Sequence, residues 1–204
     1  MKYKFGKQAK RAGLALAAVA AFTTLGIGTV QAAGTFTTAD ISINSVGFID
    51  CSFKETGLGA GAMVNYTCGA TDVGWVTQCF VKNKPVANLP IALHVAHTAD
   101  GLTTTRTYTA TGRGVITQAI LTAYPTVEEE VQEPLCPETE GVVITEEMTA
   151  IRWCNASLVD TTNNIVGVSE PTLFEQIKRN GSSAVPECGV LATLPSDILG
   201  TPQP

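Results

Sequence analysis

Residues 73–81 read VGWVTQCFV, a run that is apolar on both faces when it is drawn as a β-strand. Side chains alternate between the two faces of a strand, so Trp75 and Cys79 fall on one side and Val76 and Phe80 on the other. Apolar residues on both faces are typical of a strand inside a sheet. We therefore expect this run to be a central strand of the fold.

Further runs with the composition of strands precede and follow this one. They are rich in Thr, Val and Ile, and they cover residues 35–43, 63–68, 91–96, 102–111, 115–123, 142–145 and 151–159. Turn residues separate many of them at intervals of about 8–12 residues, a spacing typical of sandwiches and barrels. We predict an all-β fold, an antiparallel β-sandwich of immunoglobulin-like or Greek-key topology that is stabilised by disulfides.

Two connections carry recognisable signals. Asp100-Gly101 supplies the positive-φ residue of a tight turn, which predicts a hairpin between the strands on either side of it. Later in the chain, Ser169 is suited to cap a helix, and Asn180-Gly181 is suited to end one. The sequence therefore predicts one short C-terminal helix within residues 169–180.

The chain opens with the pattern of an export signal. Five basic residues up to Arg11 are followed by an apolar run that ends in Val30-Gln31-Ala32-Ala33. Signal peptidases accept this kind of boundary, so we predict cleavage after Ala32. The alternative is an uncleaved membrane anchor, which is disfavoured because Thr and Gly residues dilute the apolar run.

Removal of the leader divides the chain and changes its charge. We predict a signal peptide over residues 1–32, a single β-sandwich domain over residues 33–190 and a flexible C-terminal tail over residues 191–204. The leader carries five basic residues and no acidic one, so the formal net charge falls from −5 to −10 when it leaves. A chain this acidic repels nucleic acid and anionic lipid, so we expect no nucleic-acid partner. We also expect no membrane span after cleavage.

Six cysteines lie after the predicted cleavage site: Cys51, Cys68, Cys79, Cys136, Cys154 and Cys188. An even number of cysteines in an exported chain predicts disulfides. Redox and zinc-ribbon sites are disfavoured because no two of these cysteines are spaced C-x-x-C. A bridge between Cys51 and Cys68, across the glycine-rich residues 57–61, is favoured, and the remaining pairings stay open.

No group of residues has the pattern of a catalytic, cofactor or metal site. The only histidines, His94 and His97, fall on opposite faces of a predicted strand, which disfavours a shared metal or a proton relay. The acidic run Glu128-Glu129-Glu130 lacks the spacing of a calcium loop, and Gly57-x-Gly59-x-Gly61 lacks the lysine of a nucleotide loop. We interpret the first as a solvated edge and the second as a loop between strands. The prediction is therefore no catalytic residue, no cofactor and no metal.

Two classes of function fit these observations. The first is an exported, non-enzymatic structural or binding module of the bacterial cell surface, periplasm or medium. Its partner would be an unknown protein, a surface ligand or further copies of the chain. Self-assembly would use residues 34–43 as a strand added to a neighbour's sheet, whereas in a monomer they would be the first strand of the chain's own sheet. The alternative is a secreted hydrolase or hydrolase inhibitor, in which a histidine would meet a carboxylate and a serine in a cleft.

Overall fold

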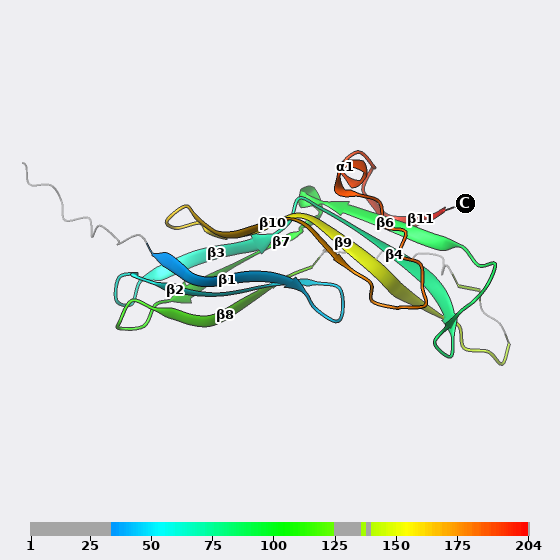
Figure 1. The fold of residues 1–204 in the computed structure, drawn as a ribbon, viewed down its shortest axis with the longest axis horizontal. Helices are drawn as coiled ribbons and strands as arrows, with labels where there is room; N and C mark the ends of the chain where they lie inside the picture. The colour runs from blue at the N-terminus through cyan, green and yellow to red at the C-terminus, as the bar shows by residue number, and fades with distance from the viewer. Residues whose placement is uncertain (1–33, 125–135, 138–139, 204) are drawn as a thin grey trace, which may run out of the picture. The chain divides into compact units, whose positions relative to one another are not determined.

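The computed structural model describes residues 34–124, 136–137 and 140–203 and shows an antiparallel all-β protein (Figure 1). The predicted leader and the run Glu128-Glu129-Glu130 lie outside these residues. The strands are β1 (Thr35–Ile43), β2 (Ile49–Thr56), β3 (Met63–Gly69), β4 (Asp72–Val81), β5 (Lys84–Pro85), β6 (Ile91–His97), β7 (Thr103–Thr109), β8 (Ile116–Ala123), β9 (Thr145–Asp160), β10 (Ile165–Glu175) and β11 (Asp197–Gln203). The helical elements are η1 (Thr98–Asp100), a 3-10 turn, and α1 (Cys188–Leu191).

In the larger sheet, β3 and β4 lie almost end to end, and so do β6 and β7. Strands β3 and β4 follow one another closely, and both pair antiparallel with the long strand β9. On their other side, β7 pairs with β3 and β6 pairs with β4. Strand β10 lies outside β9, and β11 lies outside β6. Residues 73–81 therefore form a central strand, which confirms the prediction from their alternation.

The predicted hairpin on either side of Asp100-Gly101 is wrong. Gly101 does have a positive φ of 79°, but β6 and β7 run in the same direction, past β4 and then past β3. His97 is paired with Asp72, whereas Thr103 is paired with Gly69. Thr103 thus follows His97 by six residues, whereas the paired residues Gly69 and Asp72 are only three residues apart. The additional residues between β6 and β7 form a short loop, and the chain continues in the same direction after it.

The smaller sheet has the order β1-β2-β8 and packs over the end of the larger sheet that contains β3 and β7 (Figure 1). The core between the sheets is aromatic: the ring of Phe53 on β2 lies 4.3 Å from that of Tyr66 on β3, centroid to centroid. Trp153 of β9 is fully buried in the same core. The predicted sandwich is confirmed for this half, and neither sheet of the described residues closes into a barrel. Strand β1 is the first strand of the chain's own sheet.

A second, smaller core lies on the other half of the large sheet. Buried side chains of β4, β6 and β9 meet the C-terminal segment there, namely Val76, Leu93, Val95, Ala150, Cys154, Val185 and Leu191. Gly74 allows this close approach, because a Cβ added to it would lie 2.5 Å from Leu191 Cδ2. The C-terminal segment therefore packs directly on the sheet backbone.

All six cysteines form disulfides, and the predicted bridge between Cys51 and Cys68 is confirmed. This bridge joins β2 of the smaller sheet to β3 of the larger sheet. Cys79 of β4 is bonded to Cys136, and Cys154 of β9 is bonded to Cys188 at the start of α1. The three bridges thus tie together the two sheets, the connection before β9 and the C-terminal segment.

The helix predicted within residues 169–180 is wrong, because residues 165–175 form strand β10 instead. Pairing along β9 outweighs the local capping signals, and Pro171 is tolerated because β10 is an outer strand. The one α-helix of the described residues is α1, which is four residues long. The predicted tail also differs, since Asp197–Gln203 form β11 beside β6. No helix in the described part of the chain has the length and apolar character needed to cross a membrane.

Candidate binding site

A bulge in strand β8 shapes the outer surface of the smaller sheet. Phe53 pairs with Ala119 and Glu55 pairs with Ile116, so two residues of β8 stand opposite the single residue Lys54. One of the two is Gln118, whose φ of 49° lies in the left-handed region. A residue other than glycine adopts this conformation at an energetic cost, and such residues are concentrated at functional sites.

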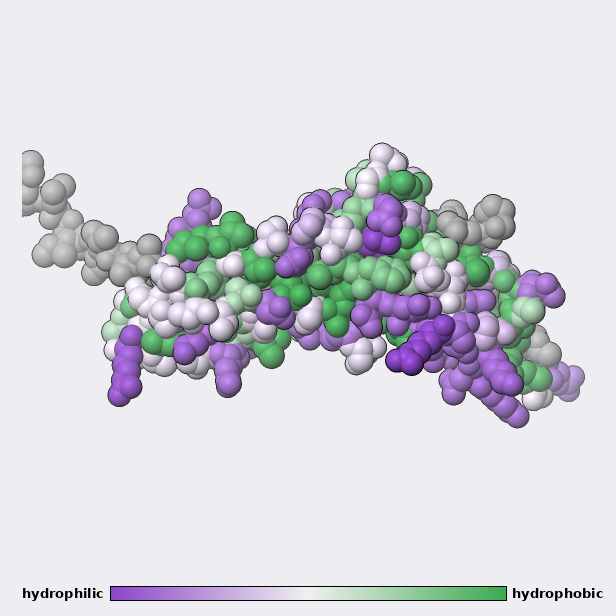
Figure 2. Space-filling model, viewed as in Figure 1, coloured by the Kyte–Doolittle hydropathy of each residue, from purple (hydrophilic) through white to green (hydrophobic). Residues whose placement is uncertain are grey.

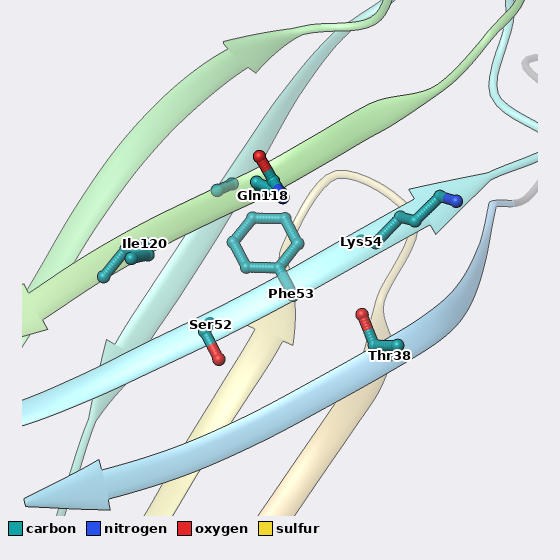
Figure 3. A pocket seen from close by; sticks show the side chains of 7 residues that line it. Thr38, Ser52, Phe53, Lys54, Gln118 and Ile120 are labelled. Atoms are coloured by element: carbon teal, nitrogen blue, oxygen red, sulfur yellow. The ribbon is translucent and has the colours of Figure 1, made fainter.

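The bulge opens a shallow recess with a volume of about 490 Å³ (Figure 3). Side chains from β1, β2 and β8 line it: Thr38, Ser52, Phe53, Lys54, Gln118, Ala119 and Ile120. Phe53 is 2% exposed, and its ring packs on Tyr66 in the core, on the opposite face of β2 from Ser52 and Lys54. Ile120 is 55% exposed and stands on the rim. The outer face of the recess is therefore lined mainly by the polar side chains of Thr38, Ser52, Lys54 and Gln118.

The chemistry of this recess suits binding. Thr38 and Ser52 offer hydroxyl groups, Gln118 offers an amide, and Lys54 offers a positive charge. Lys54 is the one titratable side chain among the described lining residues. General acid–base catalysis of hydrolysis usually needs two titratable groups or an activated nucleophile. The lining groups can donate and accept hydrogen bonds, and Lys54 can pair with an anion.

His94 lies in a buried hydrogen-bonded chain on the large sheet. Its ring stacks on Trp75 at 5.1 Å with an interplanar angle of 7°, and its Nε2 lies 2.9 Å from the hydroxyl of Thr77. Thr77 donates its hydroxyl proton to Glu146 at 2.6 Å. Because a hydroxyl has one proton, this arrangement requires His94 Nε2 to donate to Thr77. His94 thus holds β6 to β4 and β9.

His97 points to the opposite face of β6, which confirms the prediction that the two histidines diverge. Its Nδ1 lies 2.6 Å from an Asp72 carboxylate oxygen, and its Nε2 lies 2.9 Å from the carbonyl oxygen of Leu194. A carbonyl oxygen only accepts hydrogen bonds, so Nε2 carries a proton. His97 therefore fastens the C-terminal segment to β4, a structural task.

Burial of Glu55 in the aromatic core is a feature that the sequence analysis missed. Glu55 is 0% exposed, and the Tyr66 hydroxyl donates to its Oε2 at 2.6 Å. Desolvation raises the pKa of Glu55 above its ordinary value, and the nearby Asp160 carboxylate raises it further. Burial and the Glu55 carboxylate also raise the pKa of Tyr66. The signal was present, because Glu55 continues the inward alternation of Ile49, Cys51 and Phe53 along β2.

The other candidate sites of the sequence remain separate in the structure. Residues 57–61 form the loop between β2 and β3, as expected. The described residues bring together no group of three or more His, Cys, Asp or Glu side chains that suits a metal ion. The recess on β1, β2 and β8 depends on the register of a bulge, which no motif in the sequence marks. No protein-family model, curated protein or solved structure matches this chain.

Proposed function

We propose that this chain is an exported, non-enzymatic binding module that acts at the bacterial cell surface, in the periplasm or in the medium. The observation that carries the proposal is a disulfide-braced two-sheet scaffold that presents a preformed recess lined by Thr38, Ser52, Lys54, Gln118 and Ile120. Binding surfaces commonly sit on such rigid scaffolds. The recess is the binding face, and the bridges keep it in shape.

Export is supported by the cysteines together with the leader pattern. All six cysteines form disulfides, and such bonds persist in oxidising compartments rather than in the cytosol. Residues 1–32 have the composition of a signal peptide. Both features fit a protein that folds after export.

The outer strands favour binding through a face of the sheet over binding through an edge. The outer strands β1, β8, β10 and β11 each contain a shift in pairing register, at which the outer strand has more residues than the inner strand it pairs with. Bulges of this kind obstruct the addition of a further strand. These bulges disfavour assembly of copies through strand pairing at β1, β8, β10 and β11, whereas the outer strand β7 pairs with β3 without a register shift.

Polar recognition also agrees with the character of the surface. On the side in view in Figure 2, hydrophobic residues are interspersed with polar ones. The recess itself offers hydroxyl and amide groups and the cation of Lys54. The ligand class that fits is a polar chain, either an acidic sugar or an acidic extended peptide, that presents hydrogen-bonding groups and a carboxylate.

The test is binding measured by NMR with the chain that starts at Ala33. Uronic-acid oligosaccharides and acidic peptides are titrated into the ¹⁵N-labelled protein. We expect amide shifts to change around Lys54, Gln118 and Ile120. Lys54→Ala should weaken binding by about 10-fold, because a charged hydrogen bond is lost. Lys84→Ala removes an exposed lysine on β5 and should leave the affinity unchanged.

Two outcomes would contradict the proposal. One is the absence of shift changes at the recess with every probe. The other is turnover of a probe, with hydrolysis products accumulating, which would support the alternative of a secreted hydrolase.

A further inference from the structure

Strand β7 forms one edge of the larger sheet and lacks the bulges of the other outer strands. The strand order of this sheet ends at β7, which lies beyond β3. All seven residues of Thr103–Thr109 pair with β3 without a register shift, whereas β1, β8, β10 and β11 each contain a shift. Among the described outer strands of more than two residues, β7 is therefore the one regular edge that a further strand can join.

The backbone groups of alternate residues in β7 point away from β3. At the two ends of the strand, the carbonyl of Leu102 accepts from the N–H of Ala70, and Ala110 donates its N–H to Ala62. Alternate residues of a strand direct both backbone groups to the same side, so the even-numbered residues face β3. The odd-numbered residues face away, and no backbone hydrogen bond to another described strand uses them: Thr103, Thr105, Thr107 and Thr109. This edge therefore presents a row of N–H and C=O groups.

The neighbouring edge of the smaller sheet, formed by β8, is less accessible. The Tyr108 hydroxyl of β7 donates to the carbonyl oxygen of Ile120 on β8 at 2.9 Å. The bulge at Gln118 also interrupts the regular spacing of β8. An incoming strand is therefore expected to extend the larger sheet at β7.

The charge around this edge is positive, although the chain as a whole is acidic. Residues 102–123 contain two arginines and no Asp or Glu, whereas the whole chain has 18 acidic and 13 basic residues. Arg106 is the one charged side chain of the described strands β3, β7 and β8. It is exposed, its guanidinium lies 5.5 Å from the centre of the Tyr108 ring, and no ion pair of the described residues includes it. Arg106 is thus available to a carboxylate on an incoming strand.

The two faces of β7 present different side chains to such a strand. Side chains alternate, so Arg106 and Tyr108 share the face towards the smaller sheet, and the odd-numbered threonines share the outer face. On the outer face, the hydroxyls of Thr67 and Thr105 lie 2.9 Å apart, and Thr107 donates to the Asn65 side chain at 2.5 Å. An added strand would continue this polar ladder with hydroxyl-bearing side chains and would place its acidic side chain on the face of Arg106.

A second copy of this chain fits the edge poorly. Antiparallel pairing of two β7 strands about a two-fold axis would place the two copies of Arg106 directly opposite or diagonally across from each other. Like charges in these positions destabilise the pairing. The formal net charge of −5 adds repulsion between whole chains. An acidic strand from a different protein meets neither difficulty at Arg106.

We propose that the outer edge of β7 binds an extended acidic segment of another protein by strand addition. The partner backbone pairs with the four outward-facing threonines, and a partner carboxylate pairs with Arg106. The partner segment has hydroxyl-bearing residues at alternate positions and Asp or Glu between them. This edge is separate from the recess on β1, β2 and β8, and the interaction does not depend on ligand binding there.

The test is binding of a fluorescent peptide, acetyl-TVTETVT-amide, to the protein with its disulfides formed, measured by anisotropy and mapped by NMR. We expect binding, with amide shift changes in β7 and β3. The peptide with lysine in place of its glutamate should bind about 5-fold more weakly, because an ion pair is lost. Methylation of its third and fifth amide nitrogens should abolish binding, because these N–H groups face the edge.

Variants of the protein test the two parts of the proposal separately. Arg106→Glu should reverse the preference between the glutamate and lysine peptides. Arg179→Glu makes the same charge change at an exposed residue of another segment and should leave the preference unchanged. Thr105→Pro removes an outward N–H without removing a hydrogen bond to β3, and it should abolish binding of both peptides. Circular dichroism checks that each variant is folded.

Four outcomes would overturn the proposal. They are absence of binding, equal affinity for the methylated and unmethylated peptides, shift changes that avoid β7, and an unchanged preference in Arg106→Glu. Sedimentation of the protein without peptide examines the alternative occupant. A monomer supports a separate partner, whereas a dimer that is lost in Thr105→Pro would identify a second copy at the edge and overturn the proposed partner.

Discussion

Trp153 on β9 donates its indole N–H to the carbonyl oxygen of Gly47, in the turn between β1 and β2, at 2.9 Å. Trp153 lies in the larger sheet and is fully buried, whereas Gly47 lies in the turn that connects two strands of the smaller sheet. This hydrogen bond therefore ties β9 of the large sheet to the β1–β2 turn by a non-covalent route, in addition to the Cys51–Cys68 bridge between the sheets. It also fixes the turn that delivers β2 to the smaller sheet.

Replacement of Trp153 by Phe should destabilise the protein by about 2–4 kcal/mol, because it leaves the Gly47 carbonyl without a buried donor and leaves part of the indole volume empty. Urea unfolding followed by circular dichroism measures the change. Tyr124→Phe, on a half-exposed aromatic side chain, is the control and should change stability by less than about 0.5 kcal/mol. A stability equal to that of the wild type would show that the indole bond contributes nothing.

Replacement of Gly74 by Ala should loosen the C-terminal segment. The added methyl group would lie 2.5 Å from Leu191 Cδ2 and 3.3 Å from Val185 Cγ1, so the segment must move. We expect a loss of about 1–3 kcal/mol and faster proteolysis after residue 175. Gly112→Ala is the matched control, because its Cβ would have no atom within 4 Å. Identical proteolysis of the two variants would argue against tight packing at Gly74.

Local alternation along single strands carried most of what could be predicted. Residues 73–81 were recognised as a central strand because both of their faces are apolar, and this needs no knowledge of the partner strands. The hairpin at Asp100-Gly101 and the helix near Ser169 failed for the opposite reason. Each depends on long-range pairing, with β3 and β4 in the first case and with β9 in the second, and pairing outweighs local propensity.

The recess could not be predicted from the sequence for the same reason. Gln118 acquires its left-handed conformation from the register between β2 and β8, and a bulge in one strand is defined only against its partner. The burial of Glu55 could have been predicted, because Glu55 continues the inward alternation of β2. A charged side chain ordinarily favours solvent exposure, although burial is possible where a partner is supplied.

Removal of the Cys154–Cys188 bridge by serine substitution should release the C-terminal segment before the rest of the fold. The bridge spans 34 residues and is the covalent link between β9 and α1. The chain-entropy model assigns about 4 kcal/mol to a loop of this length. Hydrogen exchange should show earlier loss of protection in α1 than in β3. Uniform loss of protection across both would show that the segment unfolds with the whole domain.

Glu147 should contribute a small stability that disappears in acid. Its hydrogen bond with Lys178 lowers the pKa of Glu147 below the ordinary value. A carboxyl with a lowered folded-state pKa adds stability above its unfolded pKa, and this stability is lost as the pH falls through the folded value. Because the pair is partly exposed, Glu147→Gln should cost less than about 1 kcal/mol at pH 7. The difference from the wild type should be absent at pH 2, and a constant difference across the range would exclude the ion pair as its cause.

Glu55 should have the opposite pH dependence. Burial raises the pKa of Glu55 above the ordinary 4.5, so the folded state binds the proton more tightly than the unfolded state. Stability is then fully present below pH 4.5 and is lost as the pH rises toward the folded pKa. Glu55→Gln, which imitates the protonated form, should match the wild-type chain near pH 4 and exceed it at pH 7 by about 1–3 kcal/mol. Urea unfolding at both pH values gives the comparison, and a wild-type chain that is the more stable at pH 7 would show that the folded protein stabilises the charged form of Glu55.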